Sequence, residues 1–90
     1  MSHTESSVLA ARLKEAEAVI EIGAHYAHYK HPEALYVICG LGLIEENEEV
    51  AVIYQQVAGD HLTFIRPLSS FTAEVEQDGH NVLRFSKVER

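Results

Sequence analysis

The sequence has few residues of the kinds that mark extracellular, membrane-spanning or nucleic-acid-binding proteins. Its single cysteine, Cys39, leaves no internal disulfide to form. Lysine and arginine number 7 against 14 aspartate and glutamate residues, so the formal net charge is −7. A field of that sign opposes the phosphate neutralisation that gives most nucleic-acid affinity, and it opposes anionic membrane surfaces too. We therefore expect no nucleic-acid partner and no membrane partner.

Linkers, signal peptides and membrane spans are not expected either. Two prolines and five glycines are too few for a long linker. No stretch approaches the ~20 apolar residues of a membrane span, and the polar start Met1–Ser7 lacks the apolar core of a signal peptide. Ninety residues make one domain. We expect a cytoplasmic folding unit with an N-terminal tail and helix over residues 1–22 and a small β domain over residues 23–90.

An amphipathic helix is predicted over Val8–Ile22, with Ser6 or Ser7 as its cap and Gly23 as its stop. One apolar face recurs at steps of three and four residues. Its members are Leu9, Leu13, Ala16 and Ile20. A helix of about 15 residues is marginal alone in water, so this face must pack on something. The partner is either the chain's own sheet or the same helix of a second copy in a homodimer.

After Gly23 the pattern changes to alternation with tight turns, which predicts β-strands. The apolar alternation at residues 35–43 places Cys39 on a buried face, as a small core hydrophobe. Further strands are predicted at residues 25–30, 50–57 and 61–66, and Asp78-Gly79 predicts a hairpin between residues 72–76 and 82–88. Short connections without intervening helices indicate antiparallel pairing. We predict a mainly β fold, a small five-stranded antiparallel SH3-like barrel preceded by one N-terminal helix.

Three fragments carry a resemblance to a known family, over roughly residues 23–88. They are Gly23-Ala24-His25-Tyr26-Ala27-His28-Tyr29-Lys30, then Val52-Ile53-Tyr54, then Phe64-Ile65-Arg66-Pro67-Leu68-Ser69-Ser70-Phe71 with Arg84-Phe85 beyond. Their order and spacing resemble the small bacterial domain of unknown function 1653. The family often has Trp where Phe64 stands, and a His-Ser-Glu-Thr turn where this chain has Ile44-Glu45-Glu46-Asn47. The resemblance implies a compact SH3-like β-barrel and no particular activity.

A binding surface is predicted around an arginine at a strand end. Pro67 lacks a backbone N–H and ends the strand ladder, so Arg66 stands where its donors reach a ligand or a buried carboxylate. Tyr29, Tyr54 and Phe64 are candidates for an aromatic groove, with His28 as a hydrogen-bond partner. Such grooves bind extended or proline-rich peptides. The first hypothesis is therefore a non-enzymatic module that recognises a peptide or protein partner. In this hypothesis the acidic turn at residues 45–49 binds a lysine or arginine of the partner.

Plainer interpretations and rival functions stand beside this one. Tyrosines at such positions are also typical of packing within a sheet. Arg66, if it is buried, is also expected to form an ion pair with Glu74 or Glu76. A second hypothesis is a small-molecule or anion pocket, with or without catalysis, centred on Arg66, with Tyr54 and His28; it requires a cavity of about 300 Å³ or more. A third hypothesis is nucleic-acid binding, which the net charge disfavours and which requires four basic residues on one face. They are Lys30, Arg66, Arg84 and Lys87.

Catalytic, metal and cofactor sites find no support in the sequence. His25, His28 and His31 recur every third residue, and in a strand His28 points away from the other two. No aspartate or cysteine lies close enough to complete a zinc set. Gly40-Leu41-Gly42 is not followed by a helix and does not make a phosphate loop. We expect no metal, no cofactor and no catalytic residue, and regard enzymatic activity as the less favoured alternative.

Overall fold

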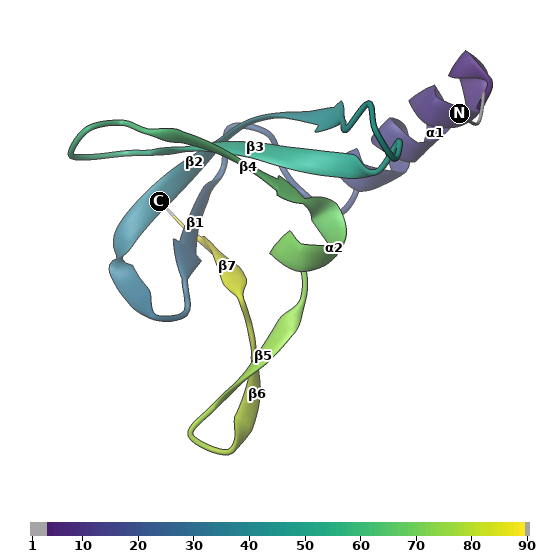
Figure 1. Ribbon diagram of the computed structural model, residues 1–90. Helices are drawn as coiled ribbons and strands as arrows, with labels where there is room; N and C mark the ends of the chain where they lie inside the picture. The colour runs from purple at the N-terminus through teal and green to yellow at the C-terminus, as the bar shows by residue number, and fades with distance from the viewer. Residues whose placement is uncertain (1–3, 90) are drawn as a thin grey trace.

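The structure is a computed structural model that describes residues 4–89. The start of the predicted unit 1–22 and the last residue of the predicted unit 23–90 lie outside the described residues. The nine elements of the structure follow one another along the chain as two helices and seven strands (Figure 1). They are α1 (Ser6–Glu17), β1 (His25–His28), β2 (His31–Leu43), β3 (Val50–Gln56), β4 (Thr63–Pro67), α2 (Leu68–Phe71), β5 (Glu74–Gln77), β6 (His80–Leu83) and β7 (Phe85–Val88). Within residues 4–89 neither helix has the length and apolar character needed to cross a bilayer.

Helix α1 begins and ends earlier than predicted. Its N-cap is Glu5 rather than a serine, and Ala18 is the C-cap. The following Val19, Ile20 and Ile22 are β-branched and lose rotamer freedom in a helix, which favours an early end. Ile20 is only 2% exposed and belongs to the core of the chain's own sheet. The predicted homodimer through Val8–Ile22 stays a prediction.

The main sheet is antiparallel throughout and has the strand order β4-β3-β2-β1-β7, which confirms the predicted five-stranded antiparallel sheet with an N-terminal helix. The long strand β2 pairs with β1 through its first half and with β3 through its second, and it bends between them (Figure 1). Gly23, with a φ of 89°, turns the chain into β1, and its N–H donates to the Ile38 carbonyl at 2.8 Å. Gly23 therefore begins the sheet rather than ending the helix.

The closed barrel predicted from the sequence is not confirmed. Among the described residues the outer strands β4 and β7 do not pair with each other, so the curved sheet stays open. The physical reason lies at Pro67, after which α2 turns the chain off the sheet. The chain then forms a separate two-stranded sheet from β5 and β6, and only β7 returns to the main sheet. Asp78 and Gly79 both have positive φ, as the predicted Asp-Gly hairpin turn requires, and β5–β6 pairing confirms that turn. The predicted strand at residues 82–88 is split, because β6 belongs to this hairpin and β7 to the main sheet.

Over the first half of β2 the buried face is the opposite of the predicted one. Ile38 is 1% exposed, whereas Cys39 is exposed, so the prediction of a buried cysteine is wrong. The cause is a register shift between Ile38 and Gly40, which changes the face of the strand partway along. Beyond the shift Leu41 packs against the same core as Ile38. The alternation at residues 35–43 is real, but the shift and the aromatic Tyr36 decide which side is inward.

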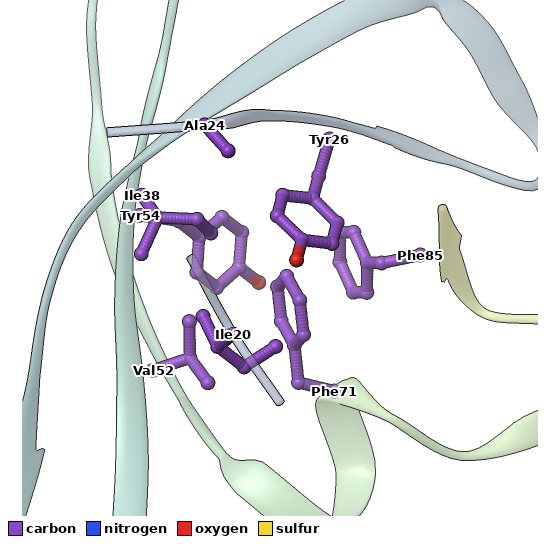
Figure 2. Packing of buried hydrophobic residues seen from close by; sticks show 8 residues of the cluster. All are labelled: Ile20, Ala24, Tyr26, Ile38, Val52, Tyr54, Phe71 and Phe85. Carbon is purple, nitrogen blue, oxygen red and sulfur yellow. The ribbon is translucent and has the colours of Figure 1, made fainter. Parts of the chain in front are cut away.

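The core lies in the concavity of the bent sheet, beneath α2 and the chain segment after α1 (Figure 2). Rings dominate it. Phe71 stacks on Phe85 with 4.1 Å between centroids and an interplanar angle of 4°, and Tyr26 and Tyr54 meet Phe71 edge-on. Edge-on and stacked ring pairs stabilise beyond the area they bury, by about 0.5–1.5 kcal/mol each. Phe71 thus ties α2 to the sheet and fixes where β4 ends.

Candidate functional site

A hollow of about 240 Å³ is formed where all five strands of the main sheet converge. We call it the Arg66 hollow. Its lining is four aromatic rings, two imidazoles and one guanidinium. These are His28, His31, Tyr36, Tyr54, Phe64, Arg66 and Phe85. Four of the five residues predicted as a binding site line it, and the fifth, Tyr29, does not.

Strand pairing explains why these side chains meet. Phe64 and Arg66 are two residues apart on β4 and therefore share one face. Tyr54 on β3 is the direct cross-strand partner of Phe64, with ring centroids 5.7 Å apart. Tyr36 approaches both rings edge-on, at 5.3 Å from Tyr54 and 6.3 Å from Phe64. The Arg66 hollow thus has a continuous aromatic wall from β2, β3 and β4.

Arg66 has only neutral partners. Its Nε donates to the Tyr54 hydroxyl oxygen at 3.3 Å, its Nη1 donates to Ser70 Oγ at 2.9 Å, and the guanidinium lies over the Phe85 ring at 5.5 Å. Within residues 4–89 Arg66 forms no ion pair with Glu74 or with any other acid, so the ion-pair interpretation is wrong. Glu74 lies on β5, in the separate two-stranded sheet. A half-buried guanidinium without a carboxylate is the unusual feature of the site.

His28 lies among positive charges. Burial lowers its pKa below the ordinary value, and the charges of Arg66, His31, Arg84 and Lys30 lower it further. The backbone N–H of Lys30 donates to His28 Nδ1 at 3.2 Å, so the neutral ring carries its proton on Nε2. Arg84 Nε is also buried, and it has no hydrogen-bond partner among the described residues. In a chain of net charge −7, positive charge is thus concentrated around this hollow.

The remaining predicted features lie elsewhere. Tyr29 flanks the site, with its ring 4.8 Å from the His28 ring and 5.9 Å from Lys30 Nζ. The acidic turn lines a different hollow of about 300 Å³ with Arg12, so it does not complete the aromatic groove as predicted. In the part of the chain that the structure describes, no three histidine, cysteine, aspartate or glutamate side chains gather as metal ligands would.

Sequence reasoning missed three lining residues, Tyr36, His31 and Phe85. The apolar alternation at residues 35–43 assigns Tyr36 to the outer face, which is the wrong parity for this half of β2. The spacing of the histidines makes His31 a candidate metal ligand only. Phe85 belongs to the Arg84-Phe85 pair near the chain end, whose one sequence signal is the family resemblance. Its sequence distance from β4 concealed that β7 closes the site beside β1.

A third, larger hollow of about 440 Å³ lies beyond Phe85 and is mostly apolar. Residues of the α1–β1 connection, β1, α2, the β5–β6 hairpin and β7 line it. They are Val19, Ile20, Tyr26, Phe71, Thr72, Leu83, Phe85 and Lys87. Its single cation, Lys87, pairs with Glu21 at 2.7 Å, and that contact raises the pKa of Lys87. With its charge already satisfied, this hollow offers less specific recognition than the Arg66 hollow.

Comparison with known proteins places the chain in a family. A family model described as protein of unknown function (DUF1653) matches residues 24–87. The chain belongs to the DUF1653 family. A crystal structure of a DUF1653 protein from Bordetella bronchiseptica superposes with a TM-score of 0.63 at 26% identity, over 73% of this chain and 85% of that one. Every lining residue of the Arg66 hollow falls within the DUF1653 match. Curated proteins give no match.

The DUF1653 assignment confirms the resemblance seen in the sequence. Helix α1 precedes the matched region, so the family pattern covers the sheet, α2 and the hairpin. The family description assigns no activity, and it therefore adds no residue role to the site. What the site does has to be argued from its own geometry.

Proposed function

We propose that this protein is a non-enzymatic binding module, and that the Arg66 hollow receives a side chain or chain end of a peptide or protein partner. The observation that carries the proposal is the convergence of four rings and one guanidinium, from four strands, on a single hollow. Rigid strands hold the wall, and flat rings with polar tips are the side chains that recognition surfaces favour. We also infer an SH3-like arrangement, supported by the strand order and the bend of β2.

The size of the hollow favours this function over a metabolite site. The small-molecule hypothesis required a cavity of about 300 Å³ or more, and the Arg66 hollow measures about 240 Å³. It accommodates one group of a larger partner better than a whole ligand. Phe64, 39% exposed, stands at its rim and continues onto a surface with exposed Leu62. A partner thus finds an apolar surface beside a polar anchor, the usual anatomy of an interface core.

The lining supports binding better than catalysis. None of the lining residues is a serine, cysteine, aspartate or glutamate. His28 therefore has no nucleophile beside it in the hollow and no carboxylate to orient it, the two contacts that nucleophilic catalysis commonly needs. Arg66 already uses hydrogen bonds to Tyr54 and Ser70 to hold its position. A fixed cation surrounded by rings suits recognition.

A matched pair of substitutions on β4 tests the proposal. Peptides selected from a random display library against the full chain would be titrated into wild-type, Phe64→Ser and Ile65→Ser proteins by calorimetry. Phe64 lines the hollow, whereas Ile65 is 67% exposed and points to the other face. We expect Phe64→Ser to weaken binding about tenfold or more and Ile65→Ser to leave it unchanged. Equal effects of both substitutions, or no selected peptide, would contradict a binding module centred here.

A further inference from the structure

We propose that the group bound in the Arg66 hollow is a carboxylate, carried by the side chain or by the C-terminus of the partner polypeptide. This inference rests on the proposed function and specifies its chemistry. Three observations support it: the surplus of hydrogen-bond donors, the absence of acids in the lining, and the local charge. Each is independent of how the partner is held outside the hollow.

The hollow presents donors without acceptors to match them. Arg66 uses Nε and Nη1 for Tyr54 and Ser70, and its remaining N–H groups have no acceptor among the described residues. Tyr54 accepts from Arg66, which leaves its own O–H free to donate. His28 accepts from the Lys30 backbone at Nδ1 and so keeps a donor at Nε2. A set of donors of this kind is complementary to a group that only accepts, as an ionised carboxylate does.

The charges around the hollow select an anion. No acid is among the lining residues, and the lining cation Arg66 has no acidic partner in residues 4–89. Glu33 is the acid that approaches the rim, where its Oε1 lies 3.9 Å from His31 Nδ1 with both side chains largely exposed. Such an exposed contact contributes little and leaves Arg66 uncompensated. The positive charges of Arg84 and Lys30 also lower the pKa of His28, which lines the hollow, so both charges are felt there.

The free donors suit a carboxylate, and the total charge of the chain disfavours a phosphodiester chain. Arg66 Nε is held by Tyr54 and one N–H of Nη1 by Ser70, which leaves Nη2 and the second N–H of Nη1, and a carboxylate can accept from such donors through its two oxygens. The aromatic wall of Tyr36 and Phe64 then contacts the apolar stem that carries the carboxylate. A phosphodiester chain would bring many charges to a protein of net charge −7, which weakens binding beyond the hollow.

The first experiment changes the ligand and leaves the protein intact. The ¹⁵N-labelled full chain would be titrated with N-acetylphenylalanine, which carries a terminal carboxylate, and with N-acetylglutamate N-methylamide, which carries a side-chain carboxylate. Their neutral matches are N-acetylphenylalanine amide and N-acetylglutamine N-methylamide. We expect amide shifts at His28, Tyr54, Phe64 and Arg66, and a Kd at least about tenfold lower for each bound acid than for its amide. The acid with the lower Kd identifies the source of the carboxylate.

The second experiment changes the anchor. Arg66→Lys keeps the charge but loses the fork, so we expect affinity for the better acid to fall several-fold, and Arg66→Gln to remove the preference for acid over amide. Arg12→Gln is the matched control, because Arg12 lines the other polar hollow. It should leave both the affinity and the preference unchanged.

Three outcomes would overturn the inference. These are equal affinity for acid and amide, shifts confined to residues outside the hollow, and tighter binding of inorganic phosphate than of either acid. The proposed function is tested separately by the selected peptides. A peptide that binds at Phe64 without any carboxylate would sustain the binding module and refute the carboxylate, whereas acids that bind in the absence of any peptide ligand would do the reverse.

Discussion

Phe85 is the side chain that joins the packed interior to the candidate site. One of its neighbours is the buried Phe71 ring, stacked at 4.1 Å, and another is the Arg66 guanidinium, at 5.5 Å from the ring centroid. Its ring lines both the Arg66 hollow and the larger apolar hollow. A substitution there would disturb packing and recognition at once. Phe64 and His28 are therefore the cleaner residues for separating the two.

His28 gives a pH-dependent prediction. Its pKa in the folded state lies below the unfolded value of about 6.5, so the unfolded chain binds the proton more readily. The stability contributed by the neutral ring is present above about pH 6.5 and is lost as the pH falls from there through the folded-state pKa. We expect His28→Gln to reduce the loss of unfolding free energy on acidification, measured by urea denaturation at a series of pH values.

The same side chain offers a direct check by NMR. The His28 ring should titrate below about pH 6.5 in the wild-type protein. In Arg66→Gln its midpoint should move upward, because one of the nearby positive charges is gone, while the effect of burial remains. A wild-type midpoint at or above about 6.5 would be inconsistent with the positive surroundings on which the carboxylate inference depends.

At the scale of the element, strand β2 organises the fold. Its 13 residues pair with β1 at one end and β3 at the other, and a register shift between Ile38 and Gly40 lets both halves face one core. Bulged strands bend and twist more strongly, which suits a sheet that curls around a ring cluster. The same bend brings Tyr36 and His31 to the hollow. One irregularity in β2 thus shapes both the core and the site.

Neighbouring residues of β2 give a prediction with a built-in control. Ile38→Ala should lower the free energy of unfolding by about 2–5 kcal/mol, because the side chain is 1% exposed and its loss leaves a cavity. Cys39→Ala should change it by less than about 0.5 kcal/mol, because Cys39 is exposed. Chemical denaturation of the two variants measures both values. A larger loss of unfolding free energy in Cys39→Ala than in Ile38→Ala would instead support the buried face predicted from the alternation.

At the scale of the whole molecule, net charge and local charge have opposite signs. The chain carries −7 in total, yet Lys30, Arg66 and Arg84 all act on His28. The fourth base of the nucleic-acid hypothesis, Lys87, is paired with Glu21 instead. A small positive region within a negative surface can orient one anionic group without attracting a polyanion.

This charge arrangement predicts no affinity for nucleic acid. Gel-shift titrations of the full chain with 20-nucleotide single-stranded and duplex DNA should show no complex at about 150 mM salt, because the total field repels phosphate chains. A basic DNA-binding domain run beside it verifies the assay. A complex whose affinity falls steeply with added salt, and which Arg66→Gln weakens, would instead assign the hollow to phosphate.

Local patterns carried much of the architecture. Alternation, short turns and the absence of a second long helix were sufficient to predict an antiparallel five-stranded sheet, and Asp78-Gly79 was sufficient to predict the turn of the separate β5–β6 hairpin. Four of the five site candidates also lie in one hollow, because Phe64, Arg66 and Tyr54 follow from strand parity near Pro67. Local patterns could not predict three features: where α1 ends, which face of β2 is buried, and that Arg66 forms no ion pair with Glu74. Each depends on contacts between distant segments.

The sequence by itself determined the class of the protein, the positions of its strands and turns, and an arginine placed at a strand end by the proline after it. These are local properties, set by side-chain period and backbone restriction over a few residues. Tertiary structure alone decided that the sheet stays open, that Cys39 faces outward, and that His31, Tyr36 and Phe85 complete the hollow. Those outcomes depend on how a bent β2 and a returning β7 share one core. That packing involves segments far apart along the chain, such as the paired His25 and Val88, and no local pattern encodes it.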